Sequence, residues 1–323
     1  LDLYRQLQFH ISTAIDPRII ELATQPLPFF ITHIDFRKCW DKTYPIFTYA
    51  TFASTNNPTV IDGEVQRCIP IGIPGYYDGP PTRPLTGETS WDSIFHQQNQ
   101  DYPWDTKIRE AIWRGSTTGS GDPLPNWEGL PRVQLVEYSL RNTTKYINAG
   151  FSKIVQRNET ETEEIKKKGL LKESVPKQDF GKYKAIIDMD GNSWSSRFAS
   201  LLCMNSVVIK IQPQWVDYFH PELVPFVHYL PVNQNLSNLQ EMVNLAMNDT
   251  MSSSMQTIVK NANRWCKEKF TGLQLTADMA WVIISYMELL KNENISSGNF
   301  SKWKEQINGN SASWNIKQDW YEV

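Results

Sequence analysis

The feature that most constrains the fold is the segment 182–211, in which two apolar runs flank a polar turn and a short amphipathic stretch. The first run, KAIID, ends in an acidic residue and indicates a buried strand. NSWSSRFASLL follows with apolar residues at helical spacing, and Ser193 is the expected N-cap. SVVIKI then returns as a strand. A strand, turn, helix and strand in this order predict a parallel, doubly wound sheet.

Other apolar runs extend this α/β pattern along the chain. PFFITHID (28–35), PIFTYATF (45–52) and AIWRGS (111–116) indicate further strands, and helical periodicity dominates the C-terminal third. Residues 70–90 are so dense in Pro and Gly that a long loop is expected there. The fold class is therefore predicted to be α/β, with two Rossmann-like domains that face a cleft.

The domain boundary is expected near residue 108. Residues 1–108 would form the first Rossmann-like domain, joined by C-terminal helices within 275–323. Residues 109–274 would form the second Rossmann-like domain, which carries the segment described first.

Composition and missing motifs exclude several classes of protein. A net charge of −3 and a pI near 6.0 argue against nucleic acid as the main partner. No apolar run approaches the ~18 residues of a membrane span, so none is expected in this chain. The five histidines form no metal-binding cluster, and neither a P-loop nor a G-x-S-x-G motif occurs.

The compartment is left open by the residues. The chain begins LDLYRQ, without a Met or an apolar signal region, which leaves open whether an N-terminal targeting segment was removed. Cys203 lies among apolar residues and is expected to be a buried thiol. N-x-S/T sequons, which matter only in a secreted protein, occur at Asn142, Asn158, Asn235, Asn248, Asn294 and Asn299.

The turn DMDGNSWSSR carries the clearest chemistry. If a helix starts after Gly191, its unpaired first N–H groups and Arg197 would form a site for a diphosphate. The alternative use of this turn is a metal site at Asp188 and Asp190, and the plain alternative is that Arg197 is a surface residue.

Other segments offer weaker signals. The hydroxyl-rich turn WRGSTTG supplies Ser116, and Arg132 lies downstream of it. Asp35 ends a predicted strand at the edge where clefts open in α/β sheets, so it is a candidate general base. The long loop contributes residue types that contact ligands, namely Tyr76, Tyr77 and Arg83.

Three segments occur together in the chain, namely AIWRGSTTG, KYKAIIDMDGNSWSSRFASLL and WVDYFHPELVPFVHYLPV. Their order and spacing resemble glycosyltransferase family 90. This family includes Rumi-type protein O-glucosyltransferases and fungal capsule-associated xylosyltransferases. The resemblance implies a GT-B fold and an inverting transfer of glucose or xylose from a UDP-sugar to a protein serine or a glycan. It implies that Asp35 is the base and that no metal or other cofactor is needed. The donor-binding residues that it implies are Ser116, Arg132, Asn192, Ser193, Trp194, Ser195, Ser196 and Arg197. Tyr76, Tyr77 and Arg83 would contact the acceptor.

Two other functions compete with this hypothesis. A metal-dependent transferase would use Asp188 and Asp190, and a non-catalytic module would bind a sugar or nucleotide without turnover. The resemblance favours the lumen of the ER or Golgi, although a cytoplasmic enzyme with free thiols fits the residues almost as well.

Overall fold

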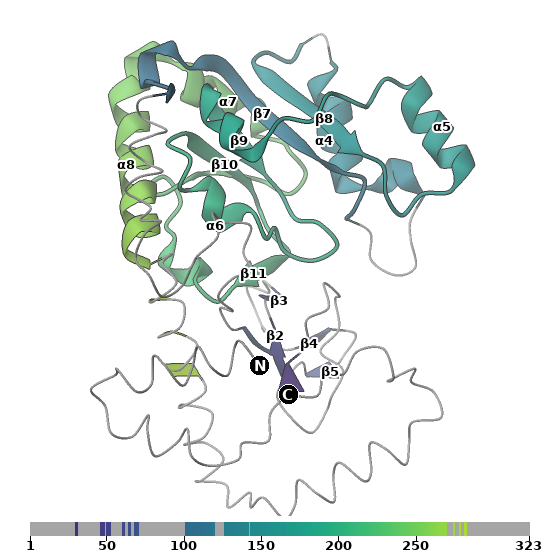
Figure 1. The fold of residues 1–323 in the computed structure, drawn as a ribbon, viewed down its shortest axis with the longest axis horizontal. Coiled ribbons are helices and arrows are strands. Elements are labelled where there is room, and N and C mark those ends of the chain that lie inside the picture. Colours follow the sequence, from purple (N-terminus) through teal and green to yellow (C-terminus); the bar gives the residue numbers. More distant parts are fainter. Residues whose placement is uncertain are drawn as a thin grey trace, which may run out of the picture.

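The computed structural model describes residues 101–119, 126–141 and 143–269, single helical positions at 274, 278, 281 and 282, and the backbone of short strands between residues 30 and 70. Its centre is a five-stranded sheet with the order β12-β10-β9-β7-β8, in which every pairing is parallel (Figure 1). The strands are β7 (Ile108–Ser116), β8 (Ile147–Lys153), β9 (Tyr183–Asp188), β10 (Val207–Ile211) and β12 (Leu230–Val232). The prediction of a parallel α/β sheet from AIWRGS, KAIID and SVVIKI is confirmed.

Helices connect these strands, as a parallel sheet requires. The connecting helices are α4 (Pro131–Ser139), α5 (Glu159–Lys167) and α6 (Phe198–Leu201), whereas α7 (Leu239–Met247) and α8 (Ser252–Lys269) follow the last strand of the sheet. Short 3-10 turns are η1 (Trp104–Thr106), η2 (Trp127–Gly129), η3 (Lys177–Lys182), η4 (His220–Glu222) and η5 (Asp249–Met251). None of the described helices has the length and apolar character that a membrane span requires.

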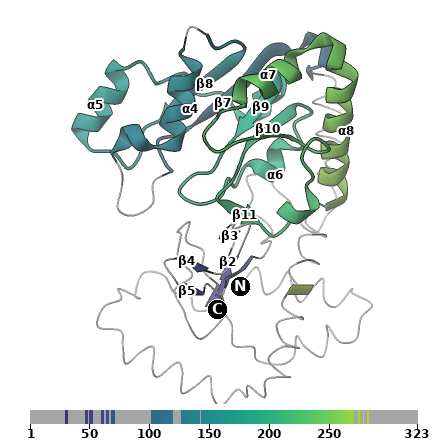
Figure 2. The same cartoon turned by 180° about the vertical axis from the view of Figure 1, so that it is seen from behind.

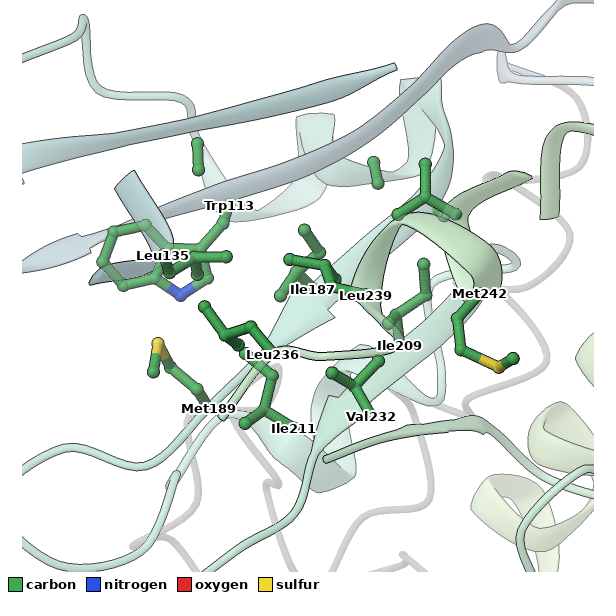
Figure 3. Packing of buried hydrophobic residues seen from close by; sticks show 14 of the residues in the cluster. Trp113, Leu135, Ile187, Met189, Ile209, Ile211, Val232, Leu236, Leu239 and Met242 are labelled. Carbon is green, nitrogen blue, oxygen red and sulfur yellow. The ribbon is translucent and has the colours of Figure 1, made fainter. Parts of the chain in front are cut away.

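Both faces of the sheet are buried, which explains the continuous apolar runs in its strands. Alternate residues point to opposite faces, so Ile187 and Ile209 belong to one core cluster while Ile186 and Val208 belong to another. Figure 3 shows the first cluster, in which Ile187 and Ile209 lie beside Leu239 of α7. The second cluster packs against α6 and the C-terminal half of α8.

The strand order places a switch point between β7 and β9. The chain moves outward from β7 to β8, then crosses back to the other side of β7 to form β9, β10 and β12. In such sheets, ligands bind outside the carboxyl ends of the strands where the order reverses. The turns after Ser116 and after Asp188 occupy that position.

The short N-terminal strands also show α/β features. β1 (Phe30–Ile31), β2 (Ile46–Thr48) and β6 (Cys68–Pro70) form a parallel sheet in the order β1-β2-β6. β3 (Ala50–Phe52) pairs antiparallel with β11 (Trp215–Asp217), and the two lie together in both views (Figures 1 and 2). β4 (Val60–Ile61) pairs antiparallel with β5 (Glu64–Val65). The two-domain division and its boundary near residue 108 stay predictions.

The expectation that Cys203 is a free buried thiol is wrong. Cys203 and Cys266 form a disulfide, with Cα atoms 5.7 Å apart and 63 positions apart in the chain. This pairing was not predictable from sequence patterns, because it depends on α8 lying across the residues that follow α6. The bond ties that helix to the turn that leads into β10.

Replacing both Cys203 and Cys266 with alanine should lower the free energy of unfolding by about 4 kcal/mol, because the open loop gains conformational entropy in the unfolded chain. Urea unfolding of the double variant beside the wild type measures the difference. Equal midpoints and slopes would show that the bond does not form in the protein.

Candidate functional site

The turns at the switch point are bonded to each other. The backbone N–H of Gly119 donates to Oδ1 of Asn192 at 3.2 Å. Gly119 has φ +118°, a conformation that favours glycine, and a Cβ at Gly191 would lie 3.1 Å from a guanidinium nitrogen of Arg132. Glycine at both positions therefore permits the turns to approach each other closely.

Arg132, from the first turn of α4, bridges the two turns. Its Nε donates to the carbonyl of Asp190 at 2.8 Å, and its Nη1 donates to the carbonyl of Ser116 at 3.1 Å and to Oγ1 of Thr118 at 2.6 Å. The guanidinium also lies over the ring of Trp113, 5.7 Å from its centroid. The structure thus brings together Ser116 and Arg132, which the sequence had placed at one site from separate segments.

The helix predicted to start at Ser193 is not formed there. α6 begins at Phe198 and has only four residues, so it offers no helical N-terminus at Asn192 or Ser193. Side chains of this segment bond across to neighbouring segments instead: Asn192 accepts from Gly119, and Ser195 Oγ donates to Oδ1 of Asp188 at 2.5 Å. These contacts hold residues 192–197 in a turn, and the expected dipole-based phosphate site is corrected accordingly.

Most of the residues expected to bind the ligand lie in this turn. Ser193, Trp194 and Ser195 are buried, whereas Asn192, Ser196 and Arg197 are partly exposed. The polar side chains of these three partly exposed residues are accessible beside the turn after β7. The turn therefore offers side-chain donors rather than a helix terminus to a bound anion.

Arg197 has an unused donor. Its Nη1 donates to the carbonyl of Arg114 at 2.6 Å, which fixes the guanidinium beside the end of β7. Its Nη2 is buried and has no hydrogen-bond partner among the residues that the structure describes. A buried charged donor without a partner is costly and calls for an explanation, which a bound anion provides.

The acidic residues of the DMD motif are engaged by a lysine that the sequence analysis missed. Lys210 Nζ lies 2.8 Å from Oδ2 of Asp188 and 3.4 Å from Oδ1 of Asp190. Burial raises the pKa of Asp190, and Lys210 opposes that rise. Burial alone would lower the pKa of Lys210, but the charges of Asp188 and Asp190 outweigh it and hold that pKa above its usual value. The lysine therefore carries a positive charge between the two carboxylates at neutral pH.

The sequence contains a signal that Lys210 is a buried, paired lysine. It is the one charged residue in SVVIKI, and all five residues of β10 are buried. A lysine is almost never fully buried unless it is paired, so a lysine inside this apolar strand indicates a buried acidic partner. In the described residues, no group of three or more His, Cys, Asp or Glu side chains is placed to hold a metal ion.

Residues 86–315 match the sequence profile of glycosyl transferase family 90. The chain belongs to this family. Among family 90 relatives, protein O-glucosyltransferase 1 of Mus musculus is 30% identical over 173 residues, which cover 51% of this chain and 40% of the relative. Protein O-glucosyltransferase 2 of Danio rerio is 30% identical over 160 residues, which cover 50% of this chain and 29% of the relative. The matched region thus spans less than half of either relative.

A solved structure of the Anabaena protein HepE in complex with UDP and glucose aligns with 87% of the family 90 chain and 75% of its own, at 12% identity and a TM-score of 0.46.

Four family 90 positions named from the sequence lie outside the described residues. They are the expected base Asp35 and the expected acceptor contacts Tyr76, Tyr77 and Arg83. Their roles stay predictions.

Proposed function

We propose that this family 90 chain transfers a sugar from a UDP-sugar donor to a hydroxyl group of an acceptor. The observation that carries the proposal is the buried, unpaired Nη2 of Arg197 beside bonded turns at the sheet's switch point. A diphosphate would satisfy that donor with a charge-assisted hydrogen bond, since arginine matches phosphate oxygens well. The names of the O-glucosyltransferase relatives agree with a sugar as the transferred group.

In this proposal the donor site is built from both turns. Ser116 would supply a hydroxyl from the end of β7, and residues 192–197 would surround the diphosphate with side-chain donors. Arg132 would add positive charge while it holds the turns together through its bonds to Ser116 and Asp190. Arginine charge of this kind can stabilise a departing diphosphate as negative charge develops on it.

The proposed site uses no metal ion. Asp188 and Asp190 share the ammonium of Lys210, so a cation of the protein already lies between the two DMD carboxylates. A divalent ion would have to displace a buried lysine before it could bind both of them. This arrangement favours the metal-independent reaction over the metal-dependent alternative.

The proposed chemistry is an inverting displacement. The acceptor oxygen attacks the anomeric carbon of the sugar, the bond from that carbon to the UDP oxygen breaks, and the hydroxyl proton passes to the carboxylate of Asp35. The carboxylate of aspartate is a weak base for a hydroxyl group, so the proton moves as attack proceeds.

The proposed architecture is GT-B, with residues 1–108 and 275–323 on the acceptor side and 109–274 on the donor side. Glucose or xylose is the proposed sugar, and a protein serine or a glycan is the proposed acceptor, contacted by Tyr76, Tyr77 and Arg83.

The direct test is UDP release from UDP-glucose and UDP-xylose by EDTA-treated protein, with and without peptide and glycan acceptors. The proposal expects acceptor-stimulated UDP release from at least one donor in EDTA. Activity that returns only with manganese would support the metal-dependent alternative. Binding of UDP without turnover of either donor would support the non-catalytic module.

We further propose that the protein works in the lumen of the secretory pathway. The disulfide between Cys203 and Cys266 supports this, because stable disulfides persist mainly in oxidising compartments. Three sequon asparagines, Asn158, Asn235 and Asn248, are exposed.

These three asparagines are expected to carry N-linked glycans. Each uses Oδ1 to accept a nearby backbone N–H, whereas Nδ2, the atom that is glycosylated, donates no hydrogen bond in the described structure. Protein secreted from eukaryotic cells should therefore lose mass on N-glycosidase digestion, and each Asn→Gln variant should lack one glycan. Unchanged mass after digestion would contradict the luminal assignment.

A further inference from the structure

Lys210 lies at the centre of the contacts that shape the turn after β9. The parallel register pairs Lys210 directly with Asp188 on the neighbouring strand, at the carboxyl edge of the sheet. The exposed fraction is 2% for Lys210 and 0% for Asp188, so water does not screen their 2.8 Å ion pair. The ammonium also lies over the ring of Phe198, 4.6 Å from its centroid.

These contacts reach both ends of one segment. Asp188 and Asp190 begin it, Phe198 ends it as the first residue of α6, and Ser195 is bonded to Asp188 within it. A single buried cation thus contacts the start and the finish of the segment that contains residues 192–197. The segment has no helical hydrogen-bond ladder of its own before Phe198, so its shape depends on such tertiary contacts.

We propose that Lys210 is a positioning residue that fixes the segment 188–198 in its ligand-binding conformation through Asp188, Asp190 and Phe198. Its importance for catalysis rests on the proposed UDP-sugar site. Lys210 does not touch the donor in this scheme: it holds the residues that do, and it takes the central place between two carboxylates that a divalent ion would otherwise occupy.

The same network extends toward the N-terminal part of the chain. Oδ2 of Asp190 accepts the backbone N–H groups of Gln214 and Trp215 at 2.7 and 3.2 Å. Trp215 belongs to β11, whose partner is β3. Lys210 therefore also fixes, through Asp190, the start of the strand that pairs with the N-terminal segment.

A simple loss of the lysine would leave the buried carboxylate of Asp188 without a cation, and that variant could fail to fold. The test therefore uses the double variant Asp188→Asn, Lys210→Met. The asparagine keeps an oxygen that can accept from Ser195, and the methionine keeps the length of the side chain and packs against Phe198. Charge balance is restored, whereas the contact to Asp190 is lost.

Hydrogen exchange and UDP binding are measured on this variant. We expect backbone amides of 190–197 to exchange about tenfold faster or more than in the wild type, while the core strands stay protected. We expect the Kd for UDP and the KM for the UDP-sugar to rise about tenfold or more, with kcat changed far less. This split distinguishes a positioning role from a general loss of folded protein.

Lys107→Met is the matched control. Lys107 is also a buried lysine of this sheet, 4% exposed, but it precedes β7 at the amino edge and donates to the carbonyl of Gly181. We expect its variant to leave exchange in 190–197 and the Kd for UDP unchanged. Wild-type exchange of 190–197 in the double variant, or equal acceleration in the control, would overturn the proposal. If wild-type protein binds no UDP, the proposed function fails, and the exchange result still decides the role of Lys210.

Discussion

The Arg197→Met variant is expected to bind UDP about ten- to hundredfold more weakly than the wild type, because a charged hydrogen bond to phosphate contributes about 1.5–3 kcal/mol. The folded state of the free variant should lose little stability, because removal of the unpartnered Nη2 offsets the loss of the Nη1 bond to the carbonyl of Arg114. Nη2 of Arg197 is buried without a partner in the described structure, so its removal also removes a desolvation cost. A residue that stabilises the ligand complex and not the empty fold is expected in a binding site.

Isothermal titration with UDP and urea unfolding measure the two quantities on the same protein sample. Arg141→Met is the control, since Arg141 is exposed just beyond the same domain's α4 and stacks on Tyr138 instead of the turns. It should leave UDP binding unchanged. Normal UDP affinity combined with a large loss of stability in Arg197→Met would mean that Arg197 only supports the fold.

The Asp35→Asn variant is expected to transfer sugar about 10²- to 10⁴-fold more slowly, because asparagine cannot accept the proton of the attacking hydroxyl. The affinity for UDP should stay at the wild-type value, since the proposed base acts on the acceptor. Steady-state UDP release with acceptor present, together with a UDP titration, separates these two effects.

Asp105→Asn is a suitable control for this variant, because Asp105 is an exposed aspartate of the short turn η1. It should transfer at the wild-type rate. Transfer by Asp35→Asn at a rate near the wild type, in a protein with unchanged melting temperature, would show that another group is the base.

The sheet was predictable from local patterns, and the grouping of its turns from the family resemblance. AIWRGS, KAIID and SVVIKI are short apolar runs separated by polar turns, and burial on both faces of a parallel sheet produces such runs. The structure confirms that Ser116, Arg132 and the turn after Asp188 come together, because the carboxyl ends of adjacent parallel strands lie at one edge.

The errors arose where tertiary contacts override local preference. Ser193 is a good N-cap by type, yet the segment around it bonds to Gly119 and Asp188, so the helix starts only at Phe198. The disulfide of Cys203 depends on a helix far along the chain.

The pairing of Lys210 with the DMD acids depends on strand register, which single-sequence patterns do not specify across a crossover. The presence of a lysine inside an apolar strand was the available signal, and it indicates that a buried partner should be sought.

A thermal-shift titration of EDTA-treated protein with UDP determines whether the turns after β7 and β9 bind a nucleoside diphosphate without a metal ion. At a concentration 100 times its Kd, UDP should add about 2.7 kcal/mol to the free energy of unfolding and raise the melting temperature accordingly. Stabilisation in EDTA that is lost in Arg197→Met is the predicted result. Stabilisation only after manganese is added, or none under either condition, would mean that these turns do not bind UDP without a metal ion.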